Sequence, residues 1–210
     1  MGRFTDRVAV VTGAGSGIGK ATAMRLSSEG ATVACLDVNG DACAATAEAL
    51  NAAGAAGAAA PGRAAGYACD VSDPASVEAV VGRVADELGP PYVLGNIVNI
   101  ASSAGIVGQP FSAAYCASKG GVIMLTKSLA NEFVGRGVRV NAVAPGGIDT
   151  PIIDSFTLPE GANRRMLARI MSPLGYGRAE DVAALIAFIA SDEAAYMTGS
   201  IVSFDGGITS

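Results

Sequence analysis

Histidine is absent from this chain of 210 residues. Its absence excludes mechanisms that use an imidazole base, from Ser/His hydrolysis to His-ligated zinc, and leaves Tyr, Lys or carboxylates for proton transfer. The four cysteines, Cys35, Cys43, Cys69 and Cys116, form no Cys-x-x-Cys pair. This spacing favours reduced thiols that pack in the interior over a disulfide framework or a zinc site. We therefore expect no metal.

Positive charge is also scarce, with 14 Lys and Arg against 19 Asp and Glu and a formal net charge of −5. Nucleic-acid binding depends on clustered basic residues, and the chain has no basic run, so we expect no nucleic-acid partner. Its apolar runs reach about half of the ~20 residues that cross a bilayer. The first residues include Arg3, Asp6 and Arg7 and lack a secretory apolar stretch. The sequence predicts a cytoplasmic protein without a membrane partner.

Short β-rich runs alternate with longer helical patterns along the whole chain. This alternation predicts an α/β fold with a doubly wound parallel sheet in three layers, built as a single domain over residues 1–210. The predicted strands are 8–12, 32–36, 67–69, 97–100, 138–143 and 201–204. The predicted helices are 18–29, 41–53, 76–88, 117–134 and 180–190.

One junction breaks the alternation. Residues 92–94 and 97–100 both resemble strands, but only Gly95 and Asn96 separate them. Parallel neighbours need a crossover of about a dozen residues or more. Either the two runs form one strand, or a crossover segment is missing between Leu94 and Gly95.

A glycine-rich turn follows the first predicted strand and leads into a helix. In this position glycines let the backbone approach a pyrophosphate, while the helix N-terminus offers unpaired N–H groups. The predicted pyrophosphate-binding residues are Gly13, Gly15, Ser16, Gly17, Ile18 and Gly19. Asp37 ends the second strand, where its carboxylate can accept hydrogen bonds from an adenosine ribose and repel a 2′-phosphate. The cofactor is therefore predicted to be NAD, with NADP disfavoured.

Tyr115 and Lys119 lie four residues apart and so share a helix face, thirteen residues after Ser102. An ammonium group and a cationic nicotinamide ring would both stabilise a phenolate, so Tyr115 can exchange a proton with an alcohol or a carbonyl compound. We expect the Ser102 hydroxyl to hydrogen-bond the same substrate oxygen.

These motifs resemble the short-chain dehydrogenase/reductase family over nearly the whole chain, which implies a Rossmann-type fold. Residues 12–19 are similar to its cofactor turn, Asp70 and Val71 to its adenine-contacting pair, and Ser102, Tyr115 and Lys119 to its catalytic residues. By the same resemblance Tyr115 and Lys119 also contact the cofactor. The segment 145–151 is similar to the family segment after the sixth strand, and implies further cofactor contacts from Pro145, Gly146, Ile148 and Thr150. Asp205-Gly206-Gly207 is likewise similar to the family sequence.

The chain departs from the family at the junction described above. The family carries an Asn-Asn-Ala-Gly motif at the end of its fourth strand, followed by a long helix with a catalytic asparagine. Neither is present around Leu94 and Gly95, which again indicates that several tens of residues are absent there. The Tyr-to-Lys spacing of four separates the chain from the related enoyl reductases, whose spacing is wider.

The resemblance implies hydride transfer between NAD and a secondary alcohol or ketone, with Tyr115 as general acid and base. Residues 150–174 are predicted to form a substrate lid. The candidate apolar pocket residues are Ile106, Val107, Phe111, Ile152, Ile153, Phe156, Leu158, Met166 and Met171. Family members are commonly tetramers, so a homotetramer is expected, and the apolar stretch 120–125 suits either a subunit interface or burial against the sheet. Two alternatives stay open: a nucleotide-binding or assembly protein with little turnover, and an enzyme that uses the same cofactor for epimerisation or dehydration.

Overall fold

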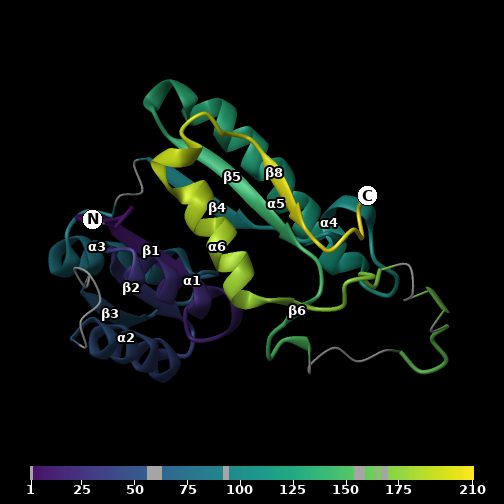
Figure 1. Cartoon of the computed structure of the whole chain (residues 1–210), viewed down its shortest axis with the longest axis horizontal. Coiled ribbons are helices and arrows are strands. Elements are labelled where there is room, and N and C mark those ends of the chain that lie inside the picture. Colours follow the sequence, from purple (N-terminus) through teal and green to yellow (C-terminus); the bar gives the residue numbers. More distant parts are fainter. Residues whose placement is uncertain (1, 56–62, 92–94, 154–158, 164, 167–169) are drawn as a thin grey trace. The chain divides into compact units, whose positions relative to one another are not determined.

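The computed structural model describes residues 2–55, 63–91, 95–153, 159–163, 165–166 and 170–210 (Figure 1). The chain forms two compact units. Unit 1 comprises residues 1–94 and 183–192, and unit 2 comprises residues 95–182 and 193–210. Helix α6 (Ala179–Ala190) contributes residues to both. No helix in the described ranges has the length and apolarity needed to span a membrane.

Unit 1 contains a parallel sheet of three strands in the order β1-β2-β3. These strands are β1 (Val8–Thr12), β2 (Thr32–Asp37) and β3 (Ala64–Ala68). Helices α1 (Gly17–Ser28), α2 (Gly40–Ala55) and α3 (Pro74–Leu88) follow the three strands in turn. Helix α3 starts where it does because the Asp73 carboxylate accepts a hydrogen bond from the Ala75 amide at 3.0 Å and Pro74 occupies the first turn.

Both faces of this sheet are covered, since successive side chains of β2 point to opposite sides. Val33 and Cys35 belong to one buried cluster, with residues of α1 and α2. Ala34 and Leu36 belong to another, with Val80 and Val84 of α3. Parallel strands with helices on both faces confirm the predicted doubly wound α/β class.

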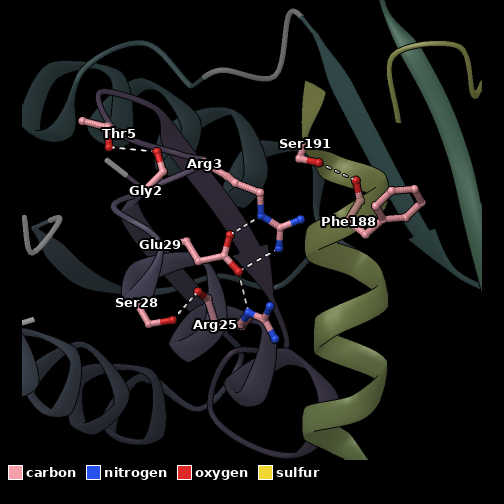
Figure 2. Close-up of polar contacts among 8 residues, drawn as sticks. All are labelled: Gly2, Arg3, Thr5, Arg25, Ser28, Glu29, Phe188 and Ser191. Carbon is pink, nitrogen blue, oxygen red and sulfur yellow. Dashed lines mark hydrogen bonds and ion pairs between the residues drawn. The ribbon is translucent and has the colours of Figure 1, made fainter. Parts of the chain in front are cut away.

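The N-terminal segment is fastened to the end of α1 by charge. Figure 2 shows the Glu29 carboxylate between two arginines: it accepts hydrogen bonds from Arg3 Nε at 2.5 Å, Arg3 Nη2 at 2.8 Å and Arg25 Nε at 2.5 Å. The hydrogen bond from Arg3 holds the pKa of Glu29 below its ordinary value, with Arg25 acting in the same direction against the opposing effect of burial. Phe4, one residue beyond Arg3, is buried in the core of unit 1.

Unit 2 contains a second parallel sheet in the order β4-β5-β8, formed by β4 (Asn96–Ile100), β5 (Arg139–Pro145) and β8 (Ile201–Phe204). Strand β5 is buried from Val140 onward. Its Asn141 side chain donates to the Met197 carbonyl at 2.9 Å and accepts from the Ser200 amide at 3.1 Å. This fully buried amide therefore fixes the turn that leads into β8.

The remaining elements of unit 2 are short, apart from α5 (Ala113–Phe133). Helix α4 (Ala104–Val107) follows β4, and the two-residue strands β6 (Ile148–Asp149) and β7 (Gly177–Arg178) pair in parallel. The 3₁₀ turns Val134–Arg136 and Asp192–Ala194 follow α5 and α6.

Most predicted elements are confirmed with small shifts at their ends. The third strand is displaced, because it covers Ala64–Ala68 where 67–69 was expected, and α5 begins four residues before the predicted start. The pair β6–β7 was not predicted. The possible strand 92–94 and parts of the proposed lid (154–158, 164 and 167–169) lie outside the described residues.

Candidate active site

The glycine turn follows β1 in the backbone shape that a phosphate cradle requires. Gly13 has a φ of +66° and Gly17 a φ of +52°, both in the region that favours glycine. A Cβ on Gly19 would lie 2.1 Å from the Gly13 carbonyl oxygen, so only glycine lets α1 start this close to the turn. Ser16 is the N-cap, and α1, all of whose residues are described, has no acidic residue in its first turn. These residues fit a pyrophosphate group.

Asp37 lies beside this turn and is hydrogen-bonded to it. Its Oδ2 accepts from the Gly15 amide at 2.9 Å, and its Oδ1 accepts from the Asn39 amide at 3.0 Å. A Cβ on Gly15 would approach Oδ2 to 2.9 Å. The turn and the predicted ribose-binding carboxylate therefore form one structural group, which the sequence spacing did not reveal.

Asp70 and Val71 follow β3 at the same edge of this sheet, because parallel strands end on one side. The Cys69 amide donates to the Asp37 carbonyl at 2.8 Å and so extends the ladder to this point. The Asp70 carboxylate accepts from the Ser72 hydroxyl at 2.7 Å and from the Ser72 amide at 2.9 Å. The hydroxyl hydrogen bond is the main reason why the pKa of Asp70 lies below its ordinary value. Val71 is exposed.

In unit 2, Ser102 follows the end of β4 and is only 8% exposed. Its hydroxyl accepts from the Ala104 amide at 3.2 Å. Its neighbours continue the sheet ladder: Ala101 donates to the Val143 carbonyl at 2.8 Å and Ser103 to the Pro145 carbonyl at 2.9 Å. The backbone on both sides of Ser102 is thus held by the sheet ladder.

Lys119 reaches from α5 to the end of the same strand. Its Nζ donates to the Ile100 carbonyl at 2.9 Å and lies 5.8 Å from the centroid of the Tyr115 ring. The amine is half-buried, and this burial holds its pKa below the ordinary lysine value. Tyr115 is 45% exposed in the first turn of α5. The arrangement places a cation beside an exposed phenol.

The structure brings Lys119 next to Tyr115 and to the strand end that precedes Ser102. In the described part of the chain, no hydrogen bond joins the hydroxyls of Ser102 and Tyr115. Two further contacts were not predicted: the Gln109 amide donates to Cys116 Sγ at 3.1 Å, and Asn99 Nδ2 donates to Thr126 Oγ1 at 2.9 Å. The first joins α5 to the backbone at Gln109 and the second joins it to a side chain of β4, and no sequence pattern indicates either contact.

The segment after β5 turns sharply toward β6. The Gly146 amide donates to the Phe204 carbonyl at 3.0 Å, and the Thr150 hydroxyl donates to the Ile148 carbonyl at 3.2 Å. Ile148 is buried and pairs with Gly177 in the small ladder. The predicted contact residues Pro145, Gly146, Ile148 and Thr150 therefore share one hydrogen-bonded segment.

A cavity of about 420 Å³ lies beside this segment. Its walls include Gly147, Leu174, Tyr176, Phe204 and Asp205. None of the seven candidate pocket residues that the structure describes lines it: Ile106, Val107, Phe111, Ile152, Met166 and Met171 are exposed and Ile153 is partly exposed. Phe156 and Leu158 lie outside the described residues.

Comparisons with known proteins place the chain among dehydrogenases and reductases. A family model described as short chain dehydrogenase matches residues 7–96, and one described as Enoyl-(Acyl carrier protein) reductase matches residues 91–209. The chain is 36% identical to the 3-oxoacyl-(acyl-carrier-protein) reductase FabG of Thermotoga maritima, covering 98% of this chain and 99% of the relative. It is 38% identical to the cis-4-hydroxycyclohexanecarboxylate dehydrogenase of Sinomonas cyclohexanicum, covering 98% of each. A solved short-chain type dehydrogenase/reductase from Mycobacterium marinum shares 27% identity, with a TM-score of 0.83 over 98% of this chain and 96% of that one.

These alignments are longer than the chain itself. The FabG alignment spans 257 positions, whereas 98% of 210 residues is about 206, so about 51 positions of the relative face no residue here. The two family models meet at residues 91–96.

Proposed function

Because the chain belongs to the short-chain dehydrogenase/reductase family, we propose that it is an NAD-dependent oxidoreductase that interconverts a secondary alcohol and a ketone. The observation that carries this proposal is the placement of Lys119, whose Nζ is anchored on the Ile100 carbonyl and lies 5.8 Å from the Tyr115 ring. The half-buried amine is held at the strand end that precedes Ser102 and lies beside an exposed phenol, which supports a joint role for the three side chains.

In this proposal each residue of unit 2 has a separate task. The Tyr115 hydroxyl donates its proton to a substrate carbonyl, or as phenolate takes the proton of an alcohol. The Lys119 ammonium stabilises that phenolate, and the Ser102 hydroxyl hydrogen-bonds the substrate oxygen as charge develops on it. Bound NAD would supply the hydride acceptor or, when reduced, the donor. Lys119 would also bind the nicotinamide ribose, and Pro145, Gly146, Ile148 and Thr150 the nicotinamide end.

Unit 1 supplies the recognition of the nucleotide. Gly13, Gly15, Ser16, Gly17, Ile18 and Gly19 would hold the pyrophosphate, Asp37 the adenosine ribose, and Asp70 with Val71 the adenine. The anchored carboxylate of Asp37 supports NAD over NADP, because it cannot turn away from a 2′-phosphate without losing its bond to the Gly15 amide. Turnover measured with NAD and NADP side by side tests this choice, and a preference for NADP contradicts it.

For the substrate we propose a secondary alcohol or ketone on an apolar body. The spacing of four between Tyr115 and Lys119 supports chemistry at a CH–OH group, although one matching family model is described as an enoyl reductase. The relatives reported above are named for a 3-oxoacyl-(acyl-carrier-protein) and for cis-4-hydroxycyclohexanecarboxylate, and both names are consistent with this class. A panel of alcohols and ketones, with NADH followed by absorbance, is the direct test. Products formed without net change in NADH would instead support epimerisation or dehydration.

We further propose that the positions without a counterpart fall between Leu94 and Gly95. The two family models meet there, and unit 1 ends where unit 2 begins. A chain without the Asn-Asn-Ala-Gly motif and the following helix favours a second function, nucleotide binding with little turnover. Intact mass of the protein purified from its natural source separates the two: a mass well above 20.7 kDa shows that the segment exists in the cell. A mass of 20.7 kDa together with tight NAD binding and no turnover would support the second function.

Assembly and location complete the proposal. Met124 and Leu125 on α5 are 63% and 52% exposed, whereas Val122 and Ile123 pack against the sheet of unit 2. The exposed side chains of the apolar stretch 120–125 support a homotetramer, which light scattering after size-exclusion chromatography would test.

All four cysteines are free thiols, which is consistent with a cytoplasmic location. Residues 150–174 are proposed as the substrate lid.

A further inference from the structure

Helix α4 packs against the backbone of α5 at Gly105. A Cβ on Gly105 would lie 2.6 Å from the Lys119 carbonyl carbon and 2.8 Å from both the Lys119 oxygen and the Gly120 nitrogen. All three are backbone atoms, so no side-chain rotation can make room. Only glycine therefore permits the observed distance between the two helices.

The same glycine is bound to the turn that carries Ser102. Its amide donates to the Ser102 carbonyl at 2.9 Å, and the Ala104 amide donates to the Ser102 hydroxyl at 3.2 Å. On the other side of the contact, Lys119 sends its amine to the Ile100 carbonyl, two residues before Ser102. These contacts connect the end of β4, the Ser102 turn, Gly105 of α4 and Lys119 of α5 to one another.

We infer that Gly105 is a positioning residue that sets the distance between Lys119 and the Ser102 turn. This inference rests on the proposed function of Ser102, Tyr115 and Lys119. Ordinary contact of a Cβ begins near 3.4 Å, so an alanine at position 105 must move α4 and the backbone of Lys119 apart by about 0.8 Å. Displacements of about 1 Å at a reacting centre cost up to about 100-fold in rate.

The test is Gly105→Ala with Gly82→Ala as a matched control. Gly82 lies inside α3, and a Cβ there would meet no described atom within 4 Å. We expect Gly105→Ala to lower kcat by about 10- to 100-fold, with KM for NAD within threefold and an unchanged circular dichroism spectrum. The Gly82→Ala control should retain the original kcat.

A double variant separates positioning from general damage. If Gly105 acts through Lys119, Gly105→Ala/Lys119→Met loses clearly less kcat than the product of the two single losses. Three results would each overturn the inference: a double-variant loss in kcat equal to the product of the single losses, a kcat of Gly105→Ala within threefold of the control, or failure of Gly105→Ala to fold. The last result would show that Gly105 is needed for folding stability. A lack of turnover in the unsubstituted chain is a different result, which counts against the proposed function itself.

Discussion

Replacing Lys119 by methionine removes the ammonium beside Tyr115 while keeping much of the apolar stem. The magnitude follows from the 5.8 Å between Nζ and the ring centroid. With the phenolate charge placed at the ring centroid, its attraction to the ammonium is worth about 2.9 kcal/mol at an effective dielectric constant of about 20, and about 0.7 kcal/mol in bulk water. These limits correspond to roughly 100-fold and 3-fold in rate. Because the amine is half-buried, we expect a loss of about 10- to 100-fold in kcat/KM.

The loss should depend on pH in a defined direction. The ammonium favours the phenolate only while it remains protonated, and burial lowers the pKa of Lys119. Its benefit is therefore present at lower pH and disappears as pH rises through that lowered pKa. Alcohol oxidation by Lys119→Met should consequently approach the original rate at alkaline pH.

The assay is NADH formation across pH with a saturating alcohol. Lys127→Met provides the control, since Lys127 is exposed on the same helix eight residues further along. Equal losses in both variants, or a Lys119→Met variant with more than half of the original activity, would show that the local cation is irrelevant to the proton transfer.

The remaining predictions address the phenol, the nucleotide and the N-terminal ion pairs. Tyr115→Phe should bind NAD normally but lose at least ~100-fold in kcat/KM, and near-original turnover would remove Tyr115 from the mechanism. Asp37→Ser should lower the preference for NAD over NADP by about tenfold or more and also weaken NAD binding, because the Gly15 amide loses its acceptor; unchanged kinetics with both cofactors contradict this. Glu29→Gln should lower the free energy of unfolding by about 1–3 kcal/mol at pH 7 in urea titrations, relative to a Glu48→Gln control on exposed α2 surface. Since the folded pKa of Glu29 lies below its ordinary value of 4.5, this stability is fully present above that value and lost as pH falls through the lowered pKa, so a difference that persists unchanged at pH 2–3 would refute the ion-pair explanation.

The sequence predicts those features that depend on neighbouring residues. The apolar run 8–12 followed by glycines predicts β1 and the start of α1, and the spacing of four predicts that Tyr115 and Lys119 share a face. Strand β3 was displaced because Ala64 and Ala65 carry little strand preference, so the pattern appears to begin only at Tyr67.

Tertiary contacts explain what sequence patterns missed. The hydrogen bond from the Gly15 amide to Asp37 joins residues 22 apart. The hydrogen bond from Lys119 is accepted by the main-chain oxygen of Ile100, which no side-chain pattern in the sequence can indicate. The pair β6–β7 is two residues long, which is too short for any periodicity to register. No residue near Gly105 in the sequence indicates its role either, because the atoms that exclude a side chain there belong to the backbone of α5.

The hydrogen bond from Lys119 to a main-chain oxygen allows the residue type at position 100 to vary. Every residue type at position 100 presents the same peptide oxygen, so substitutions there leave the anchor of the amine in place as long as β4 remains a strand. A carboxylate in that role would instead have neutralised the amine and been lost by a single mutation. Natural or laboratory diversification at position 100 is thus free to reshape the apolar packing around β4 while the electrostatic setting of Tyr115 stays constant.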